Sequence, residues 1–250
     1  MRAMIFAAGL GTRLRPLTDT MPKALVPVGG KPLLEHLILK MKAAGITDIV
    51  INVHHFADQI IHFIEQNHSF DIQIRISDER SQLLETGGGI RHAIPLFESV
   101  GEKKNEEPIL IHNVDILSNL DFSSFYVLPP EEEALLLVSR RETARYLLFD
   151  STNRLMGWTN IKTGEVKSPF PDLKVDECTK YAFAGIHLFS PRLFPYMDRW
   201  KEKFSIIDFY LSIAGKTVIR GVPKENLQLI DVGKLDSLSE AESFMKSFAT

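Results

Sequence analysis

The first half of the chain alternates short apolar runs with segments whose apolar residues recur at helical spacing. Between residues 31 and 44, for example, Leu34, Ile38 and Met41 share one helical face, and Gly45 stands where such a helix would end. Strands are predicted at 3–8, 48–53, 72–76 and 109–111, and helices at 31–44, 57–66 and 88–93. Alternation of this kind builds a right-handed parallel sheet with helices on both faces.

The second half is less regular. Strands are predicted at 134–139, 146–149, 181–189, 217–222 and 227–232, helices at 201–214 and 234–248, and a polar loop or hairpin at 157–176. We therefore expect an α/β fold with a Rossmann-like, mixed but mainly parallel sheet flanked by helices, and a small antiparallel extension. We expect one domain over residues 1–250, with a first half at 1–125 and a second half at 126–250.

Three unusual segments fall at the carboxyl ends of predicted strands. They are Gly9–Lys23, Glu85–Gly89 and Asn113–Asp115. Ligands of open α/β sheets bind beyond the carboxyl ends of the strands. The sequence therefore predicts a single site to which all three segments contribute.

Composition narrows the functional classes. The 250 residues are 44% hydrophobic with a formal net charge of −3, so no overall basic field favours nucleic acid or an anionic membrane. A single cysteine, Cys178, excludes an internal disulfide and a cysteine-rich zinc site, and we interpret it as a filler residue. No apolar run approaches about 20 residues, and the N-terminal run is too short for a signal peptide. We expect a cytoplasmic protein.

The loop after the first predicted strand has the chemistry of a phosphate site. Small residues at Ala8, Gly9 and Gly11 let backbone N–H groups approach a phosphate. Arg13 adds a guanidinium that can bind two phosphate oxygens, and Lys23 adds a compact charge. A Gly-x-Gly pair alone is also typical of an ordinary strand-to-helix turn, so the two cations carry most of the specificity.

Two other phosphate loops are excluded. A dinucleotide fingerprint needs a third glycine where this chain has Leu14, and an acidic residue where it has His54 and His55, which disfavours a nicotinamide oxidoreductase. A P-loop needs Gly-Lys-Ser/Thr after its spacer, and that sequence is missing.

The runs GLGTRLRPLT and PKALVPVGGKPLLEH resemble the signature of the sugar-phosphate nucleotidylyltransferases. Among them, the chain is most similar to the short forms that resemble N-acetylmuramate-1-phosphate uridylyltransferase, which also carry ETGGGI, found here at 85–90. The resemblance covers nearly the whole chain and extends to LIDVG at 229–233. It implies an enzyme that condenses a sugar 1-phosphate with a nucleoside triphosphate, releases pyrophosphate and uses Mg²⁺.

The resemblance also implies roles for particular residues. It implies catalytic roles for Arg13 and Lys23. It implies nucleotide contacts from Ala8, Gly9, Gly11, Thr12, Arg13, Lys23, Thr86 and Gly88, sugar contacts from Glu85, Asn113 and Gly185, and magnesium ligands at Asp115 and Asp231. Carboxylates after strands suit Mg²⁺, which takes one or two of them together with phosphate oxygens, although such an aspartate is also a common turn former or helix cap.

Two features depart from the family pattern or add to it. Val114 replaces the usual glycine in Asn-Gly-Asp, and because valine disfavours a positive φ, we expect a different turn there. Arg140, Arg141 and Arg145 form a basic group that suits an acidic sugar, such as one with a lactyl carboxylate.

The resulting hypothesis is Mg²⁺-assisted in-line attack on the α-phosphorus, with UTP favoured and GTP second. The partners are the triphosphate and the sugar 1-phosphate, with no nucleic acid or membrane, and the chain is a monomer or small homo-oligomer. Two alternatives stay open: an inactive nucleotide-sugar-binding regulatory module, and a transferase for a non-sugar phosphate such as phosphocholine.

Overall fold

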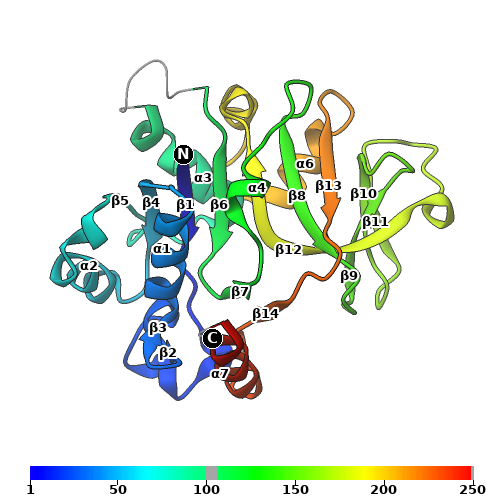
Figure 1. The fold of residues 1–250 in the computed structure, drawn as a ribbon. Coiled ribbons are helices and arrows are strands. Elements are labelled where there is room, and N and C mark those ends of the chain that lie inside the picture. The colour runs from blue at the N-terminus through cyan, green and yellow to red at the C-terminus, as the bar shows by residue number, and fades with distance from the viewer. Residues whose placement is uncertain (99–105, 249–250) are drawn as a thin grey trace.

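The computed structural model describes residues 1–98 and 106–248 and shows a ten-stranded mixed sheet with helices on both faces (Figure 1). The strand order is β11-β10-β9-β12-β6-β1-β4-β5, and β8 and β13 extend from β12. The strands of this sheet are β1 (Arg2–Phe6), β4 (Asp48–Val53), β5 (Gln73–Asp78), β6 (Ile109–Asn113), β8 (Ala134–Ser139), β9 (Arg145–Phe149), β10 (Leu155–Asn160), β11 (Glu165–Lys167), β12 (Thr179–Phe189) and β13 (Ile219–Pro223).

The four strands β5, β4, β1 and β6 are parallel and form the centre of the first half. β1 lies between β4 and β6, with Arg2 opposite both Asp48 and Ile109. β4 is buried along its whole length, which explains why four of its six residues are apolar. Their common carboxyl edge therefore presents the segments that follow Phe6, Val53 and Asn113.

The second half continues the sheet in antiparallel fashion. β12 pairs antiparallel with β6, β8 and β9, and β9, β10 and β11 form a meander. The polar segment predicted as a loop or hairpin is largely the β10–β11 hairpin. Both the parallel and the antiparallel parts agree with the predicted fold class.

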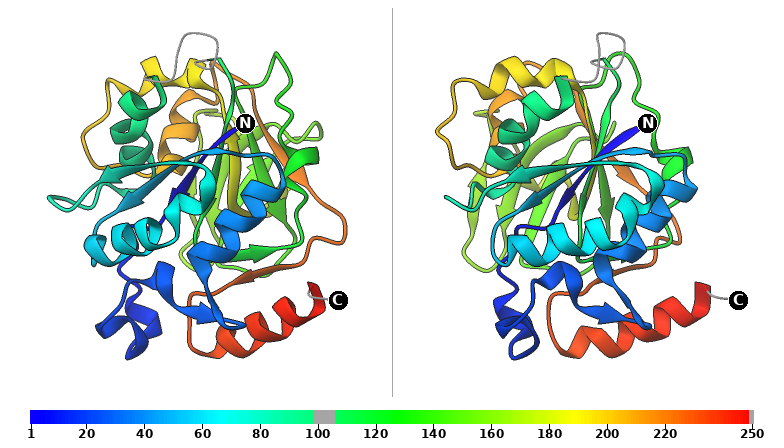
Figure 2. Two further views of the ribbon diagram at one scale, coloured as in Figure 1. Left: turned by 60° about the vertical axis from the view of Figure 1, so that its left-hand side comes forward. Right: turned by 90° about the vertical axis from the view of Figure 1, so that its left-hand side faces the viewer.

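Helices cover the two faces of the sheet (Figure 2). Ala3 and Ile5 of β1 pack into one core with helices α1 and α2, and Met4 packs into a second core with α3 and α6. The helices are α1 (Leu33–Ala43), α2 (Ala57–Gln66), α3 (Glu85–Glu98), α4 (Phe122–Phe125), α5 (Phe194–Met197), α6 (Ile206–Ile213) and α7 (Asp236–Phe248). None of the described helices is long and apolar enough to cross a membrane.

Helix α3 is longer than the predicted helix at 88–93. It begins at Glu85, so the glycines of ETGGG form its first turns. Gly87 and Gly88 pack so closely against the segment 202–204 that a side chain would not fit. A Cβ on Gly87 would lie 2.4 Å from the Phe204 ring, and one on Gly88 would lie 2.3 Å from the Glu202 carbonyl oxygen. Close packing, and not flexibility, explains these glycines.

Two short ribbons lie near helix α7, and the first of them joins the two halves of the chain. β7 (Ile116–Ser118), which the sequence pattern did not predict, pairs with β14 (Leu229–Asp231), and β2 (Pro27–Val28) pairs with β3 (Lys31–Pro32). Helix α7 lies against the β2–β3 ribbon in both figures. This arrangement brings the C-terminal part of the chain next to the segment that follows β6.

Candidate active site

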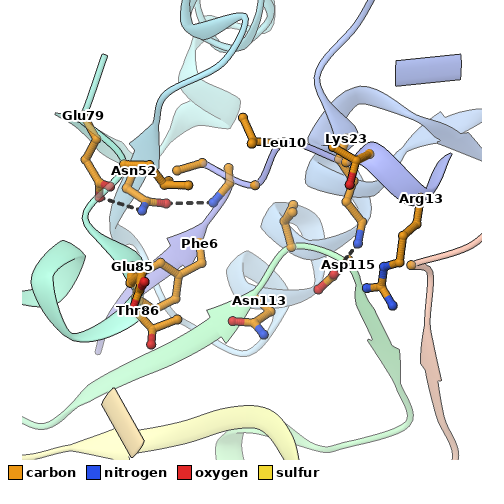
Figure 3. A pocket seen from close by; sticks show the side chains of 18 residues that line it. Phe6, Leu10, Arg13, Lys23, Asn52, Glu79, Glu85, Thr86, Asn113 and Asp115 are labelled. Carbon is orange, nitrogen blue, oxygen red and sulfur yellow. Dashed lines mark hydrogen bonds and ion pairs between the residues drawn. The ribbon is translucent and has the colours of Figure 1, made fainter. Parts of the chain in front are cut away.

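A cavity of about 420 Å³ lies at the carboxyl edge of β1, β4 and β6 (Figure 3). It brings together ten of the residues predicted for the site: Ala8, Gly9, Gly11, Thr12, Arg13, Lys23, Glu85, Thr86, Asn113 and Asp115. All three segments that the sequence placed at strand ends therefore contribute to one cavity. Gly88, Gly185 and Asp231 are not part of its lining.

Lys23 and Asp115 form an ion pair at the floor of this cavity. Lys23 begins a single 3-10 turn, Lys23–Leu25, and only 8% of the residue is exposed. Asp115 directly follows β6. The lysine is thus a buried cation whose counter-ion is the carboxylate predicted to hold magnesium. A single substitution on either side would leave a poorly hydrated charge without its partner.

Val114 fits its position without backbone strain. Its amide donates to the Phe6 carbonyl oxygen at 3.1 Å, which extends the β1–β6 ladder by one residue. Its side chain is 5% exposed, and its φ is not positive. The turn therefore does not need the glycine that the family pattern has there.

Asn113 faces the second half of the chain through Gly185. Gly185 has φ 74°, and a Cβ there would lie 2.7 Å from Nδ2 of Asn113. It also sits where the pairing of β12 with β8 changes register, between Phe183 and His187. A close backbone approach explains this glycine inside a strand, and it places two of the three predicted sugar-binding residues side by side.

His112, next to Asn113, has a structural role. It is 1% exposed, and its Nδ1 lies 2.7 Å from the Asn113 carbonyl oxygen. Burial lowers the pKa of its imidazole to about 3, so the ring is neutral near pH 7. It therefore carries no charge near pH 7. It does not line the cavity described above.

Asp231 lies next to Arg13 and Gly233, which both line the cavity. A Cβ on Gly233 would lie 2.7 Å from Oδ1 of Asp231 and 2.9 Å from Nη2 of Arg13. Asp231 pairs with Ile116 in the β14–β7 ribbon, and the Val232 amide donates to the Asp115 carbonyl oxygen at 2.8 Å. The backbones that carry the two predicted magnesium ligands are therefore hydrogen-bonded neighbours.

The donor set fits magnesium and does not fit a metal held by protein ligands alone. The described residues contain no group of three or more His, Cys, Asp or Glu side chains that could hold an ion. Magnesium needs only one or two carboxylates, because substrate phosphates and water complete its shell. Asp115 and Asp231 are the predicted pair, and their binding of magnesium stays a prediction.

Glu85 and Thr86 lie at the start of α3 and line the opposite wall. Glu85 lies 3.7 Å from the Lys203 ammonium, and the Thr86 hydroxyl accepts a hydrogen bond from the Ile206 amide at 3.0 Å. Gly88 is one turn further and faces the Glu202 carbonyl. Its contact with a nucleotide stays a prediction.

Two polar residues that the motifs did not reveal, Asn52 and Glu79, form the remaining wall (Figure 3). They are 2% and 1% exposed. Oδ1 of Asn52 accepts from the Ala7 amide at 2.8 Å, and its Nδ2 donates to Glu79 at 2.7 Å. The other Glu79 oxygen accepts from the Leu84 amide at 3.2 Å. This network joins the start of the glycine-rich loop to the segment before α3. An asparagine inside an apolar strand was the signal that could have found it.

We expect Asn52→Ala to loosen the glycine-rich loop. The substitution removes two buried hydrogen bonds and leaves the Ala7 amide without its acceptor, which predicts a loss of about 1–3 kcal/mol in the free energy of unfolding. We also expect a higher KM for the nucleotide, because the Ala7 amide begins the phosphate loop. Urea unfolding and steady-state kinetics measure the two effects. An unchanged unfolding midpoint and an unchanged KM would contradict the anchoring role.

The fold and the cavity together define an α/β protein in which backbone amides and cations follow the first strand at the carboxyl edge of a parallel sheet, an arrangement suited to phosphate. Comparison with known proteins identifies the family. Residues 2–149 match the nucleotidyl transferase family, and the chain belongs to it.

Individual relatives agree. The chain is 32% identical to N-acetylmuramate α-1-phosphate uridylyltransferase of Caulobacter vibrioides over 234 residues. The aligned region covers 90% of this chain and 89% of that protein. It is 41% identical over 126 residues to the protein of the same name from Neisseria meningitidis, covering 50% and 52%. HddC of Yersinia pseudotuberculosis, solved with GMP-PN, has the same fold, with a TM-score of 0.74, 21% identity and 98% of this chain covered against 99% of that chain.

Proposed function

We propose that this nucleotidyltransferase condenses a sugar 1-phosphate with a nucleoside triphosphate, UTP being favoured over GTP, and releases pyrophosphate. The observation that carries the proposal is the single cavity in which the glycine-rich loop, Arg13 and Lys23 face Asp115. Its relatives in Caulobacter and Neisseria, both named as uridylyltransferases, support the choice of uridine.

The reaction needs no general base. A phosphate monoester dianion is itself a nucleophile, and no histidine lines the cavity among the residues that the structure describes. One oxygen of the sugar phosphate bonds to the α-phosphorus, the bond from that phosphorus to the bridging oxygen of the β-phosphate breaks, and pyrophosphate leaves with those electrons. Catalysis then consists of alignment and charge neutralisation.

Each element of the cavity has a part in that alignment. The backbone amides of the glycine-rich loop bind the triphosphate. Arg13, at the outer end of the loop, binds the leaving β- and γ-phosphates. Lys23 offsets the charge that grows on the transferring group. Asp115 and Asp231 would hold magnesium, which when bound supplies positive charge to the phosphates.

A second cavity, of about 530 Å³, lies on the antiparallel extension. Its lining includes Phe183, which lies two residues before Gly185. It also includes Ser205, and the amide of the next residue, Ile206, donates to the Thr86 hydroxyl. Trp158 forms an aromatic wall, with the Lys167 ammonium 5.2 Å from its ring centroid. We assign this cavity to the sugar.

The charges of this cavity favour a sugar with a carboxylate. Arg141 donates to the Phe183 carbonyl oxygen at 3.1 Å, and Lys167 lies 3.1 Å from Asp208. Arg145 also lines the cavity and forms no ion pair within the described part of the chain. An arginine available in a cavity is suited to a carboxylate, which it can bind through two hydrogen bonds.

We expect Arg145→Ala to raise the KM for a sugar 1-phosphate that carries a carboxylate about tenfold, because a charge-assisted hydrogen bond is lost. The KM for a neutral sugar 1-phosphate should not change. Arg140→Ala is the matched control, since Arg140 stacks at 5.8 Å on the Tyr181 ring and does not line the cavity. If Arg145→Ala raised the KM for both sugar 1-phosphates equally, the proposal that the sugar carries a carboxylate would be rejected.

A pyrophosphate-release screen tests the function itself. The four nucleoside triphosphates are combined with N-acetylmuramate 1-phosphate, glucose 1-phosphate, mannose 1-phosphate and phosphocholine, with and without Mg²⁺. We expect release with UTP and a sugar 1-phosphate, only in the presence of Mg²⁺. Pyrophosphate release with phosphocholine and with none of the sugar 1-phosphates would favour a transferase for a non-sugar phosphate. Nucleotide binding without any release would favour the regulatory module.

A further inference from the structure

A separate cavity of about 240 Å³ lies between α1, the segment 116–120 and α7. Its walls are mostly apolar and include Leu37, Lys40, Leu117, Leu120, Phe244 and Met245, none of which lines the catalytic cavity. It is smaller than the roughly 300–1,000 Å³ of sites for drug-sized ligands, so it suits a body of one or two rings.

Lys40 supplies a cation with spare hydrogen-bonding capacity. Its ammonium donates to the Ser118 carbonyl oxygen and lies 4.8 Å from the centroid of the Phe122 ring. Within residues 1–98 and 106–248 it forms no ion pair with a carboxylate. An ammonium has three donors, and burial lowers its pKa to about 8. The Asp121 carboxylate opposes this shift by a smaller amount but does not lie within ion-pair distance of Lys40. An anionic ligand would offset the remaining cost of burying the cation.

Ser118 adds a second polar group to this cavity, and its hydroxyl has no hydrogen-bond partner among the described residues. Only 9% of the residue is exposed. The combination of an apolar wall, a cation and an unpaired hydroxyl matches one kind of ligand. That ligand has a flat apolar body and an anionic group with several acceptor oxygens.

The cavity is lined by the segment that follows Asp115, and this segment pairs with the strand that carries Asp231. Ile116 and Leu117 line it and directly follow Asp115, and Ile116 pairs with Asp231. Phe244 and Met245 belong to α7, which begins three residues after Gly233. An occupant therefore touches the β7–β14 ribbon and the helix that packs beside it.

We propose that this cavity is a second ligand site, which binds a small organic anion with a flat apolar body, and that its occupancy changes the rate of nucleotidyl transfer. The site is distinct from the substrate cavities. The binding claim does not depend on the reaction that the enzyme catalyses.

The test uses indole-3-acetate and tryptamine, which share a ring and differ in the sign of their charge. Protein carrying ¹³C-methyl methionine is titrated with each, and the methyl signal of Met245 is assigned with Met245→Leu. We expect a saturable shift of the Met245 signal with indole-3-acetate, at an affinity at least about fivefold above that for tryptamine. Because the ligands are compared in the unaltered chain, this result does not depend on the folding of any variant.

Lys40→Met then removes the charge and keeps an apolar side chain of similar length. The preference for the anion should disappear in this variant, while neutral tryptophol binds both proteins alike. A Met245 signal that indole-3-acetate does not shift, or equal affinities for the two charged ligands, would overturn the site. A shift without any change in the rate of pyrophosphate release would overturn the effector role.

Discussion

Lys23→Ala should lower kcat for pyrophosphate release at least about 100-fold, the loss that follows removal of one well-placed electrostatic donor. The structure gives a reason for a large effect, because Lys23 is a buried cation at the floor of the phosphate cavity. Its loss also frees the Asp115 carboxylate from its ion pair. The effect should fall mainly on kcat, since the charge that Lys23 offsets develops during transfer.

Lys31→Ala is the matched control for that experiment. Lys31 lies on the same part of the chain but is exposed, where it pairs with Glu35 at 3.1 Å. We expect its kcat to stay within about twofold of the parent, as for most surface substitutions. A Lys23→Ala variant that is folded and turns over at a near-normal rate would reject the catalytic assignment.

Asp115→Asn should have the second large effect, a fall in kcat of at least about 100-fold with a higher Mg²⁺ concentration for half-maximal rate. The amide keeps the shape of the side chain but loses the negative charge that a hard cation needs. It also leaves Lys23 without its counter-ion. A Mg²⁺ titration of the rate, with thermal unfolding as a check on the fold, measures these effects.

Asp71→Asn serves as the control, because Asp71 pairs with Lys42 at the surface and does not line the cavity. The double variant Lys23→Ala/Asp115→Asn adds a sharper test. Residues that act as a unit show losses that do not add, so the double variant should lose much less than the product of the two single losses. Fully multiplicative losses would mean that the two side chains act independently.

The sequence predicted the elements best where one physical pattern was continuous. β4 and α2 have the predicted boundaries, because β4 is buried along its length and α2 presents Ile60 and Ile64 to the core. The start of α3 was missed because three glycines are typical of a turn. Only tertiary packing against Phe204 shows that these glycines belong to a helix. β7 is three residues long, too short for any periodicity to reveal.

The residues of the site also fall into two groups: those that a motif could assign, and those that only the fold brings together. The glycine-rich loop, Arg13 and Lys23 are close in sequence, so a motif could assign them together. The Lys23–Asp115 pair joins residues 92 positions apart, and only the parallel order of β1 and β6 makes that contact. The anchoring of the loop by Asn52 and Glu79 depends likewise on the pairing of β1, β4 and β5.

The most direct measurement is a crystal structure of the protein with Mg²⁺ and a non-hydrolysable UTP analogue. We expect the phosphates beside the glycine-rich loop, Arg13 and Lys23 in contact with phosphate oxygens, and Mg²⁺ bound by Asp115 and Asp231. An analogue bound elsewhere, with Arg13 and Lys23 turned away from its phosphates and the two aspartates without a metal, would contradict this account.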